Sequence, residues 1–171
     1  MLPTGALLAM NTVYTASDCL KKILQDPEKK TKANILIVGT GGLALWAIRI
    51  ATHYFYQGED NERISITVAT LKDEGFILAK ECERVNVVQW NEDVYEKQLI
   101  ERTADACGGP VDVVLNFGTT SRSLHRSLQC LAEIEPPPHS VFPAEEAQEV
   151  IRKLCNSEIT GRAILKFHDV D

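Results

Sequence analysis

The stretch from Ala33 to Ile48, ANILIVGTGGLALWAI, decides the fold of this chain. It begins with branched apolar residues in a run that is too short for a buried helix and has the length of a strand covered on both faces. The run ends at a group of glycines, Gly39, Gly41 and Gly42. Apolar or small residues then recur at three- and four-residue steps, as one face of a helix requires: Leu45, Ile48, Thr52 and Phe55. We therefore predict a strand, a glycine turn and a helix.

Gly39, Gly41 and Ala44 have the G-x-G-x-x-G/A spacing of a dinucleotide-binding turn. Gly39 permits the sharp exit from the strand, and Gly41 lets the backbone approach a pyrophosphate without a Cβ between them. The small Ala44 lets the helix lie close to the strand. The helix start supplies free N–H groups and the positive end of a dipole. The motif predicts a nucleotide site, and the alternative is a glycine turn that only packs.

Length, charge and cysteine content limit the possible functions. The 171 residues are enough for one domain, and the 24 acidic against 18 basic residues give a formal net charge of -6. This balance, without a long basic cluster, argues against nucleic acid as a partner. No apolar stretch reaches the roughly 20 residues of a membrane span, so we expect a soluble, cytoplasmic protein. The five cysteines form no C-x-x-C pair, and we expect most of them to be buried.

Strands alternate with helices along the rest of the chain. We expect a helix over 4–24, with Leu8, Thr12, Thr15, Cys19 and Leu20 on one face, and then strands and helices at 64–69, 73–83, 85–88, 92–107, 111–115 and up to Leu131. This order predicts an α/β fold, a Rossmann-type doubly wound parallel sheet. The carboxyl ends of its strands would bring together 39–42, 70–72 and 116–118, where open α/β sheets bind ligands.

The end of the second strand indicates which dinucleotide is bound. A carboxylate there would bind the ribose 2′-hydroxyl and repel a 2′-phosphate. This chain has Thr70, Leu71 and Lys72 before the first acid, Asp73. A neutral hydroxyl followed by a lysine favours NADP over NAD. The alternative is that Lys72 is only a solvated residue at a helix start.

The chain resembles the cofactor-binding domain of the medium-chain dehydrogenase/reductase superfamily, which includes zinc alcohol dehydrogenases and quinone reductases. The resemblance is carried by four groups of residues: 7–10 leading to Thr15-Ala16, 35–51, 111–118 followed by 127–131, and 142–147 running on to 159–166. It implies hydride transfer from a nicotinamide cofactor to a small-molecule carbonyl, quinone or enone. By this resemblance Thr15 lies near the nicotinamide, Gly41, Gly42 and Leu43 form the pyrophosphate turn, and Asn116, Phe117 and Gly118 lie beside the cofactor. We add Gly39, Thr40, Thr70 and Lys72 from the residues themselves.

Departures from the family pattern refine these expectations. Met10-Asn11 replaces the cysteine ligand of zinc-dependent members, and the structural zinc cysteines are absent, so we expect a zinc-free protein. Glu83-Arg84 replaces a Gly-Ala pair before the third strand, where we expect a distorted turn. No pair of histidines has the spacing of metal ligands, among His53, His125, His139 and His168. The catalytic residues therefore stay unknown.

Parts of the family fold are missing from the sequence. The resembled family has a catalytic domain before this one, which the sequence does not contain, and the glycine pair and last two strands expected after Leu131 are not found, so we expect an incomplete sheet. We expect a dinucleotide-binding domain over 1–131, a linker over a missing segment at 132–143, and a closing helix and strand over 144–171. We therefore expect a segment to be absent between about Leu131 and Ile134, and the chain to be a fragment of a longer reductase-like protein.

Three functions follow. The first is an NADP-preferring, zinc-independent oxidoreductase of which this chain is the cofactor domain. The second is an inactive nucleotide-binding or protein-interaction module that keeps the fold. The third, another Rossmann domain such as a methyltransferase, is disfavoured by the closing segment 161–166. The sequence identifies no substrate, and it leaves a homodimer open.

Overall fold

The computed structural model describes residues 4–25, 31–57, 62–82, 84–132, 139–156, 158–159 and 162–166. The chain divides into two compact units, Met1–Ala132 and Glu133–Asp171, and each is described by itself. The first unit contains α1 (Thr4–Leu24), β1 (Ala33–Val38), α2 (Gly42–Tyr56), β2 (Ile64–Thr70), α3 (Asp73–Lys80), β3 (Val85–Gln89), α4 (Glu96–Cys107), β4 (Val113–Asn116) and α5 (Ser121–Cys130).

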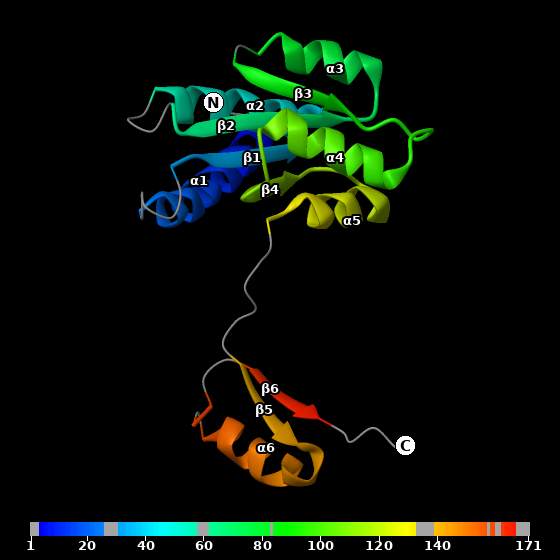
Figure 1. Cartoon of the computed structure of the whole chain (residues 1–171). Helices are drawn as coiled ribbons and strands as arrows, with labels where there is room; N and C mark the ends of the chain where they lie inside the picture. The colour runs from blue at the N-terminus through cyan, green and yellow to red at the C-terminus, as the bar shows by residue number, and fades with distance from the viewer. Residues whose placement is uncertain are drawn as a thin grey trace. The chain divides into compact units, whose positions relative to one another are not determined.

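The four strands of this unit form one parallel sheet in the order β3-β2-β1-β4 (Figure 1). Their register aligns the carboxyl ends, because Val38 pairs with both Ala69 and Asn116, and Thr70 pairs with Gln89. From β1 the chain adds β2 and β3 on one side of the sheet and then β4 on the other side. The predicted α/β fold with a doubly wound parallel sheet is confirmed, and the loops after β1, β2 and β4 meet at one edge.

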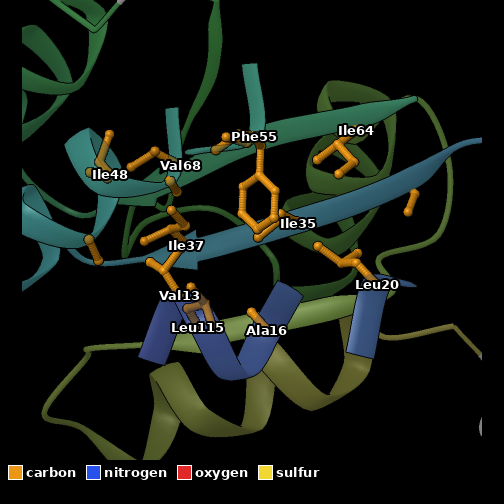
Figure 2. Packing of buried hydrophobic residues seen from close by; sticks show 14 of the residues in the cluster. Val13, Ala16, Leu20, Ile35, Ile37, Ile48, Phe55, Ile64, Val68 and Leu115 are labelled. Carbon is orange, nitrogen blue, oxygen red and sulfur yellow. The ribbon is translucent and has the colours of Figure 1, made fainter. Parts of the chain in front are cut away.

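One face of the sheet is covered by α1 and α2, which pack on Ile35, Ile37, Ile66 and Val68. Figure 2 shows Val13, Ala16 and Leu20 of α1 facing β1. The face that the sequence pattern picks out on α1 is not the one that packs on the sheet, since Leu8 is 57% exposed and Thr15 and Cys19 are exposed, while Leu20 is buried. The helix instead buries small side chains, such as Ala9 and Ala16, which let its backbone lie close to the sheet and to α2.

The other face is covered by α4 and α5. Leu36 and Val38 of β1 pack there with Trp90, Leu99 and Val111, all almost fully buried. This core also contains Cys107 and Cys130. The expectation that most cysteines are buried is wrong, because Cys19 and Cys155 are exposed and Cys82 is half-buried.

The β4 edge extends by a single parallel bridge. Val111 pairs with Leu131, and the Ala132 amide donates to the Val111 carbonyl at 2.8 Å. Because Val111 makes only this isolated bridge, the regular strand β4 starts at Val113, two residues later than expected. The fourth helix also starts later, at Glu96 instead of Glu92.

The second unit is a strand-helix-strand element. It consists of β5 (His139–Pro143), a 3-10 turn η1 (Ala144–Glu146), α6 (Ala147–Cys155) and β6 (Arg162–Lys166), and its two strands pair in parallel. Residues 139–143, which the sequence pattern places in a linker over a missing segment, form strand β5 and pair with β6. Most of the remaining junction, where a missing segment was expected, lies outside the described residues.

Candidate functional site

A cleft of about 530 Å³ opens at the carboxyl edge of the four-stranded sheet. The loops after β1, β2 and β4 line it with Gly39–Gly41, Thr70–Lys72 and Phe117–Thr120. Residues of α3 and α5 complete its walls, among them Gly75, Leu78, Arg122 and Arg126. This volume lies within the range of small-molecule sites, and the position is the one where open α/β sheets bind ligands.

Gly39 and Gly41 of the glycine turn differ in their backbone conformation and in the space around them. Gly39 has a φ of 104°, and a Cβ on it would lie 3.5 Å from the Phe117 carbonyl carbon. Gly41 instead has an extended backbone that any residue adopts, with φ -70° and ψ 173°, and no atom lies within 4 Å of its Cβ position. The protein's own packing therefore does not require glycine at 41. The space beside it stays open at the N-terminus of α2, where first-turn N–H groups lack intrahelical partners.

Two threonine hydroxyls join the loops after β1 and β2. The Thr40 and Thr70 Oγ1 atoms are 3.0 Å apart, and Thr70 also donates to the Lys72 carbonyl at 3.4 Å. Gly75 of α3 packs against both, since a Cβ there would lie 2.0 Å from Thr40 Oγ1. The buried Thr70 hydroxyl thus has partners within the protein, and Lys72 is the exposed polar group of this loop.

Trp90 and Arg126 form part of the cleft wall next to that loop. The Trp90 amide donates to the Thr70 carbonyl at 2.7 Å, and its indole N–H donates to the Thr103 hydroxyl at 2.9 Å. The Arg126 guanidinium lies 5.6 Å from the centre of the Trp90 ring. Arg126 is only 2% exposed although it lines the cleft.

Glu96 of α4 holds two arginines of α5. Arg126 donates from Nε to Glu96 Oε1, and from Nη2 to Glu96 Oε2 at 3.0 Å. Arg122 makes longer contacts to Oε2, at 3.3 and 3.4 Å. The hydrogen bond from Arg126, with the charges of both guanidinium groups, holds the pKa of Glu96 below its usual range. The cluster therefore carries one carboxylate and two guanidinium groups at neutral pH.

Seven of the predicted cofactor residues line the cleft: Gly39, Thr40, Gly41, Thr70, Lys72, Phe117 and Gly118. Gly42 and Leu43 follow directly as the exposed first residues of α2. Asn116 ends β4, and its Oδ1 accepts the Gly118 amide at 2.7 Å, which shapes the loop.

Thr15 is placed differently. It is exposed on α1, does not belong to the cleft lining, and donates its hydroxyl to the Asn11 carbonyl at 2.9 Å. Its predicted contact with the nicotinamide stays a prediction.

Sequence reasoning missed the cleft residues Gly75, Trp90, Arg122 and Arg126. A signal existed for three of them. Trp90 directly follows the third strand, and Arg122 and Arg126 are four residues apart just after the glycine of the β4 loop, hence on one face of a helix. Gly75 carried no such signal, because its role depends on the packing of α3 against Thr40.

The described residues contain neither a candidate metal site nor a candidate membrane-spanning helix. No three His, Cys, Asp or Glu side chains there are grouped so that they could share a metal ion. None of the described helices combines the length and apolar character of a membrane-spanning segment.

Comparisons with known proteins give structural likenesses. No family model matches the chain, and no curated protein matches it in sequence. Among solved structures, a protein named as a zinc-binding dehydrogenase, gutB, from Clostridium scindens is 16% identical over 93% of this chain and 41% of its own, with a TM-score of 0.49. The alcohol dehydrogenase TADH from Thermus sp. ATN1 is 13% identical over 97% of this chain and 61% of its own, with a TM-score of 0.48.

A third likeness is the quinone oxidoreductase from Thermus thermophilus, reported with its NADPH complex, at 17% identity over 94% of this chain, 62% of its own and a TM-score of 0.28. The chain thus spans less than two thirds of each of these proteins. Their names describe two of them as dehydrogenases and one as a quinone oxidoreductase. With these identities and TM-scores they do not assign the chain to a family, and the strand order and glycine turn are what identify its fold.

Proposed function

We propose that this chain is the cofactor-binding domain of an NADP(H)-preferring, zinc-independent oxidoreductase that reduces carbonyl, quinone or enoyl substrates. The observation that carries the proposal is the open space at Gly41. A dinucleotide pyrophosphate needs a close backbone approach at this position, and the cleft begins there. A bound nicotinamide would supply the hydride chemistry, and the protein would bind and orient it.

The residues present fit such a cofactor. The free N–H groups at the start of α2, on Gly42 and Leu43, would hold the pyrophosphate, with the positive end of the helix dipole behind them. The Thr40 hydroxyl, fixed by Thr70, lies beside this turn in the cleft lining.

Preference for NADP(H) is supported by the loop after β2. Lys72 is exposed and lines the cleft. Asp73, the first acidic residue after the strand, does not belong to the lining, and its carboxylate accepts a hydrogen bond from Gln89 Nε2 at 2.5 Å. These positions support a contact between Lys72 and a 2′-phosphate, since the nearest carboxylate in sequence is engaged with Gln89. Zinc independence rests on Met10-Asn11, where zinc-dependent members of the resembled superfamily carry a cysteine ligand.

A titration of the purified chain tests this proposal. NADPH and NADH are added separately, and binding is followed by fluorescence of the reduced nicotinamide and by thermal shift. We expect both to bind, NADPH more tightly. Gly41→Val should abolish binding without lowering the melting temperature, because no protein atom lies within 4 Å of the new Cβ and the added side chain would fill the ligand's space.

Two further variants sharpen the titration. Lys72→Glu should weaken NADPH binding and leave NADH binding nearly unchanged. Gly5→Ala, which alters a glycine of α1 outside the cleft, should bind like the unmodified chain. Absence of binding to either dinucleotide, or full binding by Gly41→Val, would contradict the proposal.

A further inference from the structure

Arg126 is a buried side chain that lines the cleft and has one nitrogen, Nη1, for which no hydrogen bond to the described residues is found. It is 2% exposed, and its Nε and Nη2 atoms donate to Glu96. Among the described residues, Nη1 has no hydrogen-bond partner. Every fully buried side-chain nitrogen and oxygen in this part of the chain does have a partner, so Nη1 is not fully buried. Nη1 therefore keeps its small exposure, and the opening that it meets is the cleft, which Arg126 lines.

The structure places this guanidinium next to the loop that carries Lys72. Trp90 connects them, because its amide bonds to the Thr70 carbonyl at 2.7 Å and its ring lies 5.6 Å from the Arg126 guanidinium carbon. The cleft is thus lined by a lysine on one wall and by an arginine on the neighbouring wall.

Arg122 adds a second guanidinium one helical turn before Arg126. Its side chain is 52% exposed and lines the same cleft, and its contacts to Glu96 are longer than those of Arg126. Because Glu96 already accepts two hydrogen bonds from Arg126, Arg122 can exchange this contact for one with a ligand at little cost.

The charges in the cleft favour a specific contact over general attraction of anions. Glu74 and Glu92 also line it, and together with Glu96 they balance the charges of Lys72, Arg122 and Arg126. Recognition would depend on donors placed in a fixed geometry, which a guanidinium held by a carboxylate provides.

We propose that Arg126 and Arg122 donate hydrogen bonds to the ribose 2′-phosphate of NADP(H), beside Lys72, and are specificity-determining residues of the cleft. This inference rests on the proposed function, since it needs a dinucleotide whose pyrophosphate lies at the glycine turn. With that phosphate at the turn, the 2′-phosphate is the remaining anionic group of the ligand.

The test compares dissociation constants for NADPH and NADH in three variants. Arg122→Gln should weaken NADPH binding about tenfold, as loss of a hydrogen bond between charged groups predicts, and change NADH binding less than about twofold. Arg126→Lys keeps the charge but loses the planar fork, and it should lower the NADPH preference as well. Arg102→Gln, an exposed arginine of α4 outside the cleft, is the charge-matched control and should change neither constant.

Competition by adenosine 2′,5′-bisphosphate and by 5′-ADP identifies the phosphate. Arg122→Gln should weaken the first competitor and not the second. Near-UV circular dichroism reports whether Arg126→Lys is folded, and the exposed Arg122 carries the test if it is not. Equal effects on NADPH and NADH, or none, would overturn this inference and leave the proposed function standing. Failure of the unmodified chain to bind either dinucleotide would overturn both.

Discussion

The hydroxyl oxygens of Thr40 and Thr70 lie 3.0 Å apart and join the loops that follow β1 and β2. Thr40 belongs to the glycine turn, and Thr70 ends the strand that precedes Lys72. Both threonines are β-branched and have few side-chain rotamers, so their contact fixes the distance between the two loops. The predicted positions for a pyrophosphate and for a ribose phosphate are thereby set relative to each other before a ligand arrives.

Gly75→Ala should break this relationship. Its new Cβ would lie 2.0 Å from Thr40 Oγ1 and 2.6 Å from Thr70 Oγ1, so both threonines or α3 must move. We expect the free energy of unfolding, measured with urea, to fall by about 1 to 3 kcal/mol. Gly41→Ala is the matched control and should leave it unchanged within about 0.5 kcal/mol, because its Cβ meets no atom. Equal stability of the two variants would show that Gly75 is not packed as described.

Glu96→Gln should destabilise the chain by about 1 to 3 kcal/mol, because it leaves the buried Arg126 without its carboxylate. The control Glu101→Gln removes an exposed carboxylate of the same helix and should cost less than about 0.5 kcal/mol.

The effect of Glu96→Gln should depend on pH. The folded state lowers the pKa of Glu96 below the usual 4.5, so its charged form stabilises the fold at higher pH, and this contribution is lost as pH falls through the lowered pKa. The difference between the two proteins should therefore shrink in acid. A difference that stays constant down to pH 3 would contradict an ionised Glu96.

The free energy of unfolding should fall at alkaline pH, partly because of Cys130. Burial, together with the neighbouring Cys107, raises its pKa from 9.0 to about 11. The unfolded chain loses this proton near pH 9 while the folded chain keeps it, so the contribution to stability is complete below pH 9 and is lost between about pH 9 and 11. Cys130→Ala should show a smaller loss of stability from pH 8 to pH 10.5 in urea unfolding. The control Cys155→Ala, at an exposed thiol, should behave like the unmodified chain.

Tyr56 should stabilise the turn before β3. Arg84 there has a φ of 63°, in the left-handed region, and the Tyr56 hydroxyl donates to its carbonyl at 2.6 Å. The Arg84 guanidinium also lies 4.1 Å from the centre of the Tyr56 ring. Tyr56→Phe should lower the free energy of unfolding by about 1 kcal/mol. Tyr54→Phe, at an exposed tyrosine of the same helix, is the control, and an equal effect would exclude the turn contact.

The main sheet and the glycine turn were predictable because their signals are local. Buried parallel strands are continuous apolar runs, and Gly39 and Gly41 stand directly between a strand and a helix. The buried face of α1 was not predictable in this way. Its small residues carry a weak periodic signal, and they are buried because the packing of α1 on α2 and the sheet leaves no space for larger ones.

The far wall of the cleft depended on tertiary packing. The cluster of Trp90, Glu96 and Arg126 joins three segments that are brought together only by the β3-β2-β1-β4 order. Strand β5 was missed because its five residues include a proline and gain their pairing from β6, more than fifteen residues later. Contacts of long sequence separation explain both differences.

The central claim is that a dinucleotide binds with its pyrophosphate at the glycine turn. It is tested most directly by titrating the ¹⁵N-labelled chain with NADP⁺ and following amide chemical shifts. We predict the largest changes at Gly41, Gly42 and Leu43 and at the Trp90 indole, and none around Asn34 and Asn86, which line a cleft at the opposite edge of the sheet. Unchanged shifts at the glycine turn, or larger changes at the opposite edge, would contradict the claim.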